Sequence, residues 1–416
     1  MVKWFLSLEN FKSIRQLERL EGKPITLLVG SNNAGKTSVL QALLLLKGSL
    51  AYPEVVLSFR NDLVDMGSFQ DTVTKGHDEE GISIKLGEEG DRGAWSFFLR
   101  VDTLEGTLQI RGCDVVSKES RFSYRRPLSS EEPTATFIDL REGVLGGREA
   151  IEGLRWRSFL PSFHIHGRRR PRLGLWEAQQ FLDLIQYIGP LRVYPQRSYP
   201  RQPPPTPDVG IDGRWAPYLL RKANKDQLQD LRRWLGPEGF GLVKDLRVRD
   251  VEDLPEFVVE VNIQRQWVNL RDVGFGMSQL LPTVVESIFA PAMSWRGSSL
   301  LLLEQPEIHL HPKAQADLGT FIAEMAQKGR HYLIETHSEY LVMRLATEVR
   351  RGHLSPDDIA ICFLSLDEQG HTQFRHIPLG EDGRLPPPEE WPEGFFDTNI
   401  EEADAFLFAS LERAEA

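Results

Sequence analysis

The strongest constraint on this chain is a glycine-rich segment, residues 30–37, with the sequence GSNNAGKT. The residues before it, 24–29, are predicted to form a buried strand, and residues 36 to about 46 an apolar helix. A strand, this loop and a helix, in that order, match the pattern G-x-x-x-x-G-K-[ST] in the context that a phosphate-binding loop requires. We therefore expect an α/β fold built around a site for nucleotide phosphates.

The residue types in this loop explain how it would hold phosphate. Glycines let the backbone curl so that several N–H groups point at one phosphate, and the following helix adds the positive end of its dipole. Lys36 is expected to reach the β- and γ-phosphates, and the Thr37 hydroxyl to bind Mg²⁺. The alternative, a glycine turn that arose by chance, is disfavoured by the strand before the loop and the helix after it.

A second segment, residues 300–312, ends an apolar strand in a carboxylate and reads LLLLEQPEIHLHP. An acid that supports Mg²⁺ belongs at the end of such a strand, and Glu304 is that acid. The next position usually carries the base that orients water in nucleotidases of this kind, and here it is Gln305. Glutamine can hold a water but cannot take its proton, so Glu307 is the candidate substitute. The alternative for Glu307 is a loop or helix-start carboxylate.

Two shorter segments are predicted to lie where helices begin. Residues 272–279 read DVGFGMSQ before an apolar helix, which makes an anion-receptive helix start with Ser278 as N-cap or first residue. A plain helix cap is the alternative. Residues 335–338 read ETHS after a strand, where His337 could contact a γ-phosphate or be structural.

Other metal chemistry finds little support in the sequence. His309 and His311 are two residues apart, but no third ligand lies nearby, so structural or interface roles are favoured. The two cysteines, Cys113 and Cys362, form neither a disulfide framework nor a zinc motif.

Composition limits the partners of the chain. A net charge of −11 argues against a surface broadly attractive to nucleic acid, although a local basic patch stays compatible with it. No apolar run approaches the ~20 residues needed to cross a bilayer, so we expect a cytoplasmic protein without membrane contact. Arginines that could contact DNA, or lie in solvated loops, occur with aromatic residues at Arg121, Phe122, Tyr124, Arg125 and Arg126, and as a run at Arg168, Arg169, Arg170 and Arg172.

The rest of the chain divides around the core. Short alternating runs from 81 to 140 predict strands, and residues 175–188 and 214–235 have a helical period. Residues 358–379 predict a β-hairpin. We predict an ATPase core in two parts, 1–75 and 256–350, with a β-rich and helical insertion at 76–255 and a small α+β extension at 351–416.

These motifs, in this order, resemble the ATP-binding-cassette type of P-loop ATPase. They look most like its soluble branch, which includes chromosome-maintenance and recombination-repair ATPases and the overcoming-lysogenization-defect family. Residues 10–14, NFKSI, match the opening of that branch. The most similar group is one of bacterial AAA-like ATPases, which share E-Q-P-E-x-H-L-H-P, G-x-G-x-S-Q and the segment IGPLR at 188–192. This group also has a C-terminal domain of unknown function with W-P-x-G-F-F-D, found here at 391–397.

The resemblance implies a site shared between two subunits that bind ATP and Mg²⁺ head to tail. Glu304 would support the metal, His337 would be the switch histidine, and Gln70 is the candidate for the glutamine that precedes the metal. Phosphate contacts within one subunit would come from Gly30, Ser31, Asn32, Asn33, Ala34, Gly35, Lys36, Thr37 and Ser38. Contacts to the γ-phosphate of the second subunit would come from Gly274, Gly276, Ser278 and Gln279.

Several functions remain open at this point. Gln305 stands where the catalytic glutamate usually lies, so hydrolysis is expected to be slow or to rely on Glu307. The first hypothesis is a switch or scaffold ATPase that controls a separate effector, such as a nuclease, in a bacterial defence-like system, because too few residues follow Arg350 for a nuclease domain. The alternative is a DNA-repair ATPase that binds nucleic acid directly. A transporter subunit is disfavoured by the opening motif and the long insertion.

Overall fold

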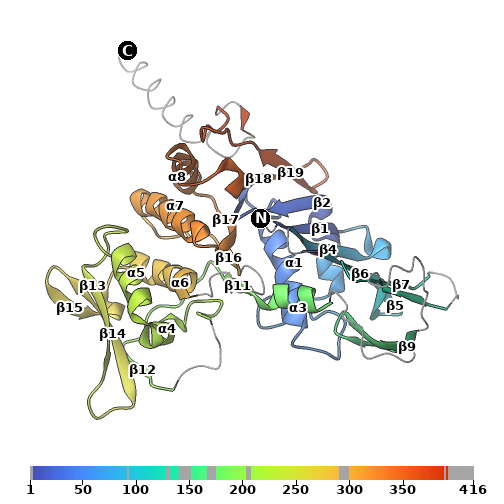
Figure 1. The fold of residues 1–416 in the computed structure, drawn as a ribbon, viewed down its shortest axis with the longest axis horizontal. Coiled ribbons are helices and arrows are strands. Elements are labelled where there is room, and N and C mark those ends of the chain that lie inside the picture. The colour runs from blue at the N-terminus through green and yellow to red at the C-terminus, as the bar shows by residue number, and fades with distance from the viewer. Residues whose placement is uncertain are drawn as a thin grey trace, which may run out of the picture.

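The computed structural model describes residues 3–90, 93–127, 132–139, 151–165, 175–202, 208–289, 299–387 and 390–391. A core sheet lies between a large antiparallel sheet on one side and a lobe of helices and short strands on the other (Figure 1). The architecture is therefore α/β, as predicted. In the sequence, the lobe and most of the antiparallel sheet lie between core strands, whereas the first two strands of the antiparallel sheet precede the core.

The core sheet has six strands in the order β11-β16-β17-β3-β18-β19. The first five are parallel to their neighbours, and β19 pairs antiparallel with β18. Adjacent parallel strands end at the same edge of a sheet, so the loops after them converge there. The strands are β3 (Ile25–Gly30), β11 (Ile185–Ile188), β16 (Leu300–Glu304), β17 (His331–Glu335), β18 (Ile359–Leu366) and β19 (Thr372–Ile377).

Both faces of this sheet are buried, which explains the continuous apolar run in β16. Leu300 and Leu302 pack into the cluster that contains α1 and the antiparallel sheet. Leu301 and Leu303 pack on the other face, into the cluster of α6, α7 and α8. Successive side chains of a strand point to opposite faces, so only a strand covered on both sides needs apolar residues throughout. The helices are α1 (Lys36–Ser49), α6 (Phe275–Phe289), α7 (Pro312–Gln327) and α8 (Glu339–Arg350).

The antiparallel sheet contains seven strands in the order β2-β1-β4-β5-β6-β7-β8. Its inner face shares a hydrophobic cluster with α1 and with α3 (Leu175–Asp183). A separate hairpin is formed by β9 (Ile151–Arg157) and β10 (Leu160–Ile165). The seven strands are β1 (Lys3–Phe11), β2 (Ile14–Gly22), β4 (Ile82–Gly90), β5 (Gly93–Leu104), β6 (Thr107–Ser117), β7 (Ser120–Arg125) and β8 (Thr134–Asp139).

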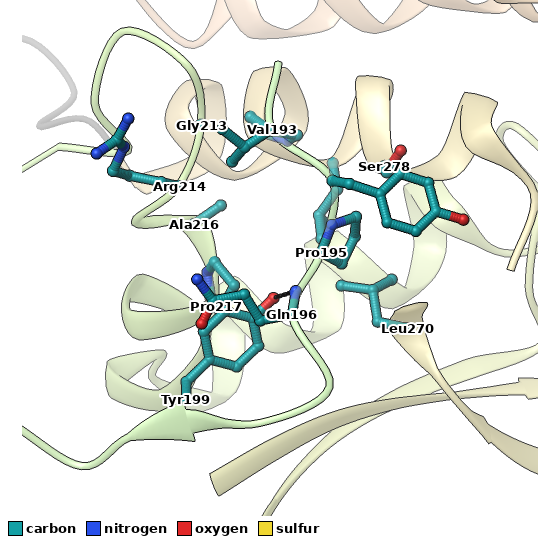
Figure 2. A pocket seen from close by; sticks show the side chains of 13 residues that line it. Val193, Pro195, Gln196, Tyr199, Gly213, Arg214, Ala216, Pro217, Leu270 and Ser278 are labelled. Atoms are coloured by element: carbon teal, nitrogen blue, oxygen red, sulfur yellow. Dashed lines mark hydrogen bonds between the residues drawn. The ribbon is translucent and has the colours of Figure 1, made fainter. Parts of the chain in front are cut away.

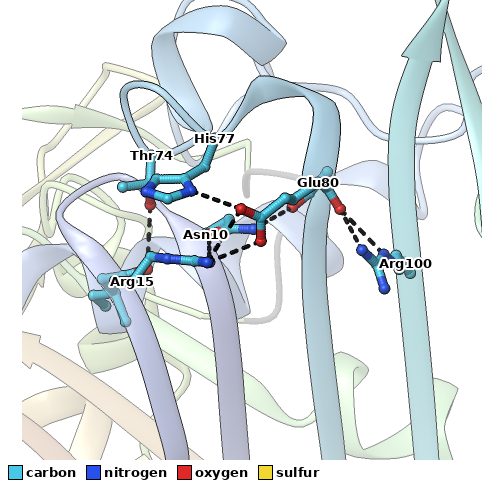
Figure 3. Close-up of polar contacts among 8 residues, drawn as sticks. Asn10, Arg15, Thr74, His77, Glu80 and Arg100 are labelled. Carbon is cyan, nitrogen blue, oxygen red and sulfur yellow. Dashed lines mark hydrogen bonds and ion pairs between the residues drawn. The ribbon is translucent and has the colours of Figure 1, made fainter.

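The turn between β1 and β2 carries the NFKSI segment and is held by polar contacts (Figure 3). Asn10 is buried, has a φ of 55° and donates a hydrogen bond to the Gly81 carbonyl at 3.0 Å. The Glu80 carboxylate, in the short helix η1 (Asp78–Glu80), accepts from Arg15 at 2.9 Å and contacts His77 at 2.8 Å. These contacts lower the pKa of Glu80 to about 2. The opening segment therefore anchors the antiparallel sheet beside the phosphate loop.

The lobe on the other side combines helices with a small sheet in the order β12-β14-β13, to which β15 is added. The predicted helix 214–235 is divided into two helices, which are separated at Ala223 and Asn224. The Asn224 side chain caps the second helix by accepting a hydrogen bond from the Gln227 N–H at 2.9 Å. The elements are β12 (Tyr199–Pro200), α4 (Ala216–Lys222), α5 (Lys225–Leu235), β13 (Asp245–Asp250), β14 (Glu256–Ile263), β15 (Gln266–Asn269) and η2 (Leu270–Asp272).

Two sequence predictions are corrected by the core sheet. The predicted helix 175–188 ends at Asp183, and its last residues form β11, because pairing with β16 overrides their helical period. The predicted hairpin at 358–379 is present, but β18 pairs with β3 inside the core sheet. The segment predicted as an extension, 351–416, thus contributes β18 and β19, which follow η3 (Pro356–Asp358), to the core sheet.

Candidate nucleotide site

Four adjacent strands bring the predicted chemical residues to one edge of the core sheet. The phosphate loop follows β3, and Glu304 and Glu335 end β16 and β17 at paired positions. The segment containing Arg192 follows β11, which is the next strand beyond β16. The site is thus built where sequence-distant loops meet at the carboxyl ends of parallel strands.

The phosphate loop adopts the conformations that its glycines permit. Gly30 and Gly35 have φ angles of 129° and 93°, and a Cβ at Gly30 would lie 2.0 Å from the Leu364 carbonyl oxygen. Lys36 is only 3% exposed, and its Nζ donates hydrogen bonds to the carbonyls of Gly30 at 3.1 Å and Ser31 at 2.7 Å. The lysine therefore lies within the curve of the loop.

Burial lowers the pKa of Lys36, while the nearby carboxylates of Glu335 and Glu307 oppose this shift. The lysine thus faces acids from two neighbouring strand ends. Because its contacts are to neutral carbonyls, its charge is available to a phosphate.

Glu335 is a site residue that the sequence analysis did not single out. Its Oε2 accepts a hydrogen bond from the Thr37 hydroxyl at 2.8 Å, and the residue is 4% exposed. Burial raises the pKa of Glu335 to about 7, with a further contribution from Glu304. Glu335 lies beside the loop because β17 pairs with β3, the strand that leads into the loop, although its position at a strand end in the ETHS segment was a usable signal.

Glu304 lies next to the pair formed by Thr37 and Glu335. It is held by a tyrosine that was not predicted from the sequence either. The Tyr187 hydroxyl, from β11, donates to Glu304 Oε2 at 2.6 Å. Burial raises the pKa of Glu304, and this hydrogen bond opposes the shift. Glu304 is therefore oriented from its far side, with its carboxylate at the strand end.

These oxygen atoms fit a magnesium ion. Mg²⁺ prefers hard oxygen ligands and is usually held by one or two carboxylates together with phosphate oxygens. The Thr37 hydroxyl, the Glu304 carboxylate and the Glu335 carboxylate supply such donors from three neighbouring loops or strand ends. Gln70, by contrast, is exposed on the short helix α2 (Phe69–Thr72), so its assignment to the metal stays a prediction.

The residues after Glu304 turn back toward His337, the predicted switch histidine. Gln305 has a φ of 44°, and its N–H donates to the Glu335 carbonyl at 2.8 Å. Glu307 is 7% exposed, and its Oε1 accepts the His337 N–H at 2.7 Å. Burial raises the pKa of Glu307 and lowers that of His337. The structure thus brings Gln305, Glu307 and His337 into one cluster with the predicted acid.

The two remaining histidines have contacts of their own. His311 is the N-cap of α7, where its Nδ1 accepts the Lys313 N–H at 3.5 Å. The His309 ring contacts Phe275 edge-on, with ring centroids 4.7 Å apart. His309 therefore links the loop after β16 to residues 272–279, which form the signature segment.

The signature segment differs from the prediction in one respect. Helix α6 begins at Phe275, so Ser278 is neither an N-cap nor a first residue. Because the helix starts directly after Gly274, Ser278 lies within its first turn, where the hydroxyl donates to the Phe275 carbonyl at 2.6 Å. Ser278 is also buried. The exposed part of the segment is Gly274 and Phe275, and Gly276 is partly exposed.

The segment that follows β11 lies against the signature helix. Gln279 Nε2 donates to the Arg192 carbonyl at 3.4 Å, and the Tyr194 ring stacks on Phe275 with centroids 5.8 Å apart. A pocket opens between this segment and α6 (Figure 2). Its lining includes Tyr194, Pro195, Tyr199, Gly213, Ser278 and Pro282. Helix α6, the signature helix, therefore contacts the segment after β11. Through Arg192, the same segment also reaches the acid cluster, which consists of Glu304, Glu307 and Glu335.

The arginine–aromatic segment in the antiparallel sheet does not form a base-stacking surface. Phe122 and Tyr124 are 0% and 6% exposed, because β7 turns them into the core. Arg125 pairs with Asp114 at 2.6 Å. The run at residues 168–172, the segment 392–397 and the acidic residues 401–404 lie outside the described residues.

The fold and the site together define a P-loop ATPase of the ATP-binding-cassette type. Residues 25–344 match the family described as "AAA domain, putative AbiEii toxin, Type IV TA system", and the chain belongs to this family. Residues 354–404 match DUF3696, a family of unknown function, which agrees with the predicted C-terminal domain. No curated protein matches the chain. Within the described residues, every helix is too short or too polar to span a bilayer.

Solved structures of SMC head domains are similar to the chain at low sequence identity. One is the SMC head domain from Thermotoga maritima, 11% identical with a TM-score of 0.42, covering 90% of this chain and 98% of that one. A second is an SMC head bound to the C-winged helix domain of ScpA, 14% identical with a TM-score of 0.45, covering 91% and 98%. A third is an Smc head domain with an extended coiled coil, bound to the C-terminal domain of ScpA derived from Pyrococcus furiosus. It is 12% identical with a TM-score of 0.42, covering 91% and 97%.

The raised pKa of Glu335 predicts how pH affects the stability of the nucleotide-free protein. Its folded pKa of about 7 lies above the ordinary glutamate pKa of 4.5, so its favourable contribution is complete below pH 4.5 and is lost as pH rises through about 7. Glu335→Gln is therefore expected to raise the Tm by a few degrees at pH 8 and to change it little at pH 4.5. Thermal melts at both pH values test this, with exposed Glu18→Gln as the control. A larger gain at pH 4.5 than at pH 8 would contradict the assignment.

Proposed function

We propose that this chain is an ATP-dependent dimerising switch that controls a separate effector protein. The observation that carries the proposal is a site divided between two parts of the chain. The phosphate loop and its acids occupy the edge of the core sheet, while the signature glycines lie on the helical lobe at the exposed start of α6 (Figure 1). A second copy, arranged head to tail, could bring its signature to this subunit's nucleotide.

The exposed signature face has the chemistry of a contact surface for a second copy. Phe275 and Tyr194 are stacked on each other yet are 41% and 44% exposed, and Leu191 is 83% exposed. Large exposed apolar groups grouped around a helix start indicate an interaction site. A twofold pair would use both complementary faces of each subunit and hold two nucleotides. Gly274, Gly276 and the helix start would then offer backbone N–H groups to the partner's γ-phosphate.

Within one subunit, the described residues can be given roles in hydrolysis. Lys36 holds the β- and γ-phosphates, and the Thr37, Glu304 and Glu335 oxygens would hold Mg²⁺, which when bound neutralises phosphate charge. Glu307 accepts the proton of the attacking water, for which burial has raised its pKa. The water oxygen bonds to the γ-phosphorus while the bond to the bridging oxygen breaks, and ADP leaves with that oxygen.

The role of Glu307 as the base predicts that two substitutions change kcat in opposite directions. Glu307→Gln keeps the shape but removes the base, so kcat is expected to fall about 100-fold with nucleotide affinity retained. Gln305→Glu restores a carboxylate at the usual position and is expected to raise kcat. Steady-state phosphate release measures both, and exposed Glu368→Gln, in the turn between β18 and β19, is the control. An unchanged rate for Glu307→Gln would exclude Glu307 as the base.

The effector is proposed to be a separate protein, such as a nuclease, in a bacterial defence-like system. The description of the matched family as a putative toxin of a toxin–antitoxin system supports this setting. The test is co-purification with the product of the neighbouring gene, with and without a non-hydrolysable ATP analogue. Wild type should hold the partner in a nucleotide-dependent way, and Lys36→Met should not respond to the analogue. A complex that is the same in every condition, or no complex at all, would count against the proposal.

A further inference from the structure

Arg192 is a buried arginine whose charge is incompletely satisfied. It is 6% exposed, and its Nη2 makes one long hydrogen bond, 3.4 Å, to the Glu304 carbonyl. Its Nε and Nη1 are also buried and have no hydrogen-bond partner among the described residues. A buried cation with open donors costs free energy unless an acceptor completes it. The arginine therefore points to an acceptor that binds at this place.

The surroundings of Arg192 indicate where that acceptor lies. Arg192 Nη2 reaches the Glu304 carbonyl, and the Glu304 carboxylate accepts the Tyr187 hydroxyl. Burial lowers the pKa of Arg192, and the nearby Glu307, Tyr187 and Glu304 at the strand ends of the site oppose this shift. Glu307 Oε2 is itself buried with no hydrogen-bond partner among the described residues. Open donors on Arg192 and an open acceptor on Glu307 thus belong to the same cluster.

A single bound anion would satisfy the donors of Arg192 but not the acceptor of Glu307. A phosphoryl group with a water beside it, as in ATP hydrolysis, would satisfy both. A phosphoryl oxygen is an acceptor and would satisfy Arg192, but it would repel the Glu307 carboxylate. A water beside that phosphoryl group is a donor and would satisfy Glu307. We infer that Arg192 binds the γ-phosphoryl group of ATP from within its own subunit, while Glu307 holds the attacking water. The inference rests on the proposed ATPase function and adds to it a residue that distinguishes ATP from ADP.

The backbone of the same residue reaches the signature helix. The Arg192 carbonyl accepts a hydrogen bond from Gln279 Nε2, and Gln279 is 1% exposed in α6. Binding of the γ-phosphoryl group by the Arg192 side chain would therefore fix the segment against which α6 packs. The presence of ATP rather than ADP in one site is thereby communicated to the face that meets the second copy.

The test measures the ATP-over-ADP preference in the monomer, so that dimer formation does not contribute. All variants carry the background substitution Gly274→Arg, which places a bulky cation on the signature face and so prevents dimerisation. Calorimetry then gives the Kd of a non-hydrolysable ATP analogue and the Kd of ADP, each with Mg²⁺. Arg192→Met should weaken analogue binding about tenfold or more, because a charge-assisted contact is lost, and leave ADP binding nearly unchanged. Arg192→Lys, which keeps the charge with fewer donors, should be intermediate.

A second buried arginine provides the matched control. Arg330 is also 6% exposed, but it lies before β17 and donates to the Ser287 carbonyl at 2.9 Å, away from the strand ends of the site. Arg330→Met should leave the ratio of the two affinities unchanged. If Arg192→Met does not fold, Arg192→Lys decides, since its ratio must also fall. An unchanged ratio, or an equal loss for both nucleotides, would overturn the inference, whereas failure of the parent chain to bind either nucleotide would overturn the proposed function instead.

Discussion

Lys36→Met is expected to abolish ATP turnover, with a loss of at least about 100-fold. The Lys36 Nζ is held inside the loop by the carbonyls of Gly30 and Ser31, so the charge is aimed at the place where phosphates would bind. Methionine fills a similar volume but offers no charge and no donor. Phosphate release under steady-state conditions measures the turnover, and calorimetry with a non-hydrolysable ATP analogue measures the binding.

A second lysine in the same helix separates this effect from a general loss of stability. Lys47 is half-buried at the other end of α1, where its Nζ donates to the carbonyls of Leu182 at 3.1 Å and Asp183 at 3.2 Å. Lys47→Met should lower the Tm while leaving turnover per folded molecule near that of wild type. Equal losses of turnover in Lys36→Met and Lys47→Met would contradict a specific role of Lys36 in ATP turnover.

Gly274→Arg is expected to abolish ATP-dependent dimerisation without unfolding the subunit. A Cβ at Gly274 would meet no atom within 4 Å, and its φ lies outside the left-handed region, so the free subunit can accept a side chain there. In the proposed pair, the same position faces the partner's nucleotide, where an arginine has no space. Light scattering after size-exclusion chromatography should show wild type shifting from monomer to dimer with the ATP analogue, and the variant staying monomeric.

An arginine elsewhere on the lobe is the control for the added charge. Gln229 is exposed on α5, and Gln229→Arg adds the same side chain to the same lobe. This control should dimerise with the ATP analogue as wild type does. If Gly274→Arg also dimerised normally, the signature face would not be the interface.

The sequence predicted those parts of the site whose residues are contiguous. The phosphate loop could be recognised because its glycines, Lys36 and Thr37 lie within one short segment between a strand and a helix. Glu304, Glu307 and His337 could also be found, since each ends an apolar strand or lies within a few residues of its end. Such local patterns reflect backbone requirements that do not depend on the rest of the fold.

The residues that were missed depend on contacts between distant segments. Glu335 becomes a site residue because β17 pairs with β3, the strand that leads into the phosphate loop, so its carboxylate lies next to the Thr37 hydroxyl. The IGPLR segment was recognised as a shared motif, but no role was assigned to Arg192. Its role required knowing that residues 185–188, predicted as the end of a helix, form β11 at the edge of the core sheet.

The shift in the start of α6 has a similar origin. Sequence preference placed Ser278 at the helix start, whereas the ring of Phe275 is held between Tyr194 and His309 from other segments. These tertiary contacts favour a helix that already begins at Phe275. As a result, the exposed contact surface is formed by Gly274 and Phe275, and Ser278 is buried behind it.

The most direct test of the shared site is to mix two inactive variants and measure ATP turnover. Lys36→Met lacks the phosphate-loop lysine and Gly274→Arg lacks a usable signature face, so each should be inactive alone. In an equal mixture, a head-to-tail pair of one copy of each contains one complete site, made from the Lys36 of one subunit and the Gly274 of the other. Neither variant pairs with itself in response to ATP, and in the mixed pair the added arginine faces the Lys36→Met site, which holds no nucleotide. Turnover is then expected to recover to at most about one half of wild type, because every pair is mixed and each has one intact site. A mixture that stays as inactive as its components would contradict a site completed by the second subunit.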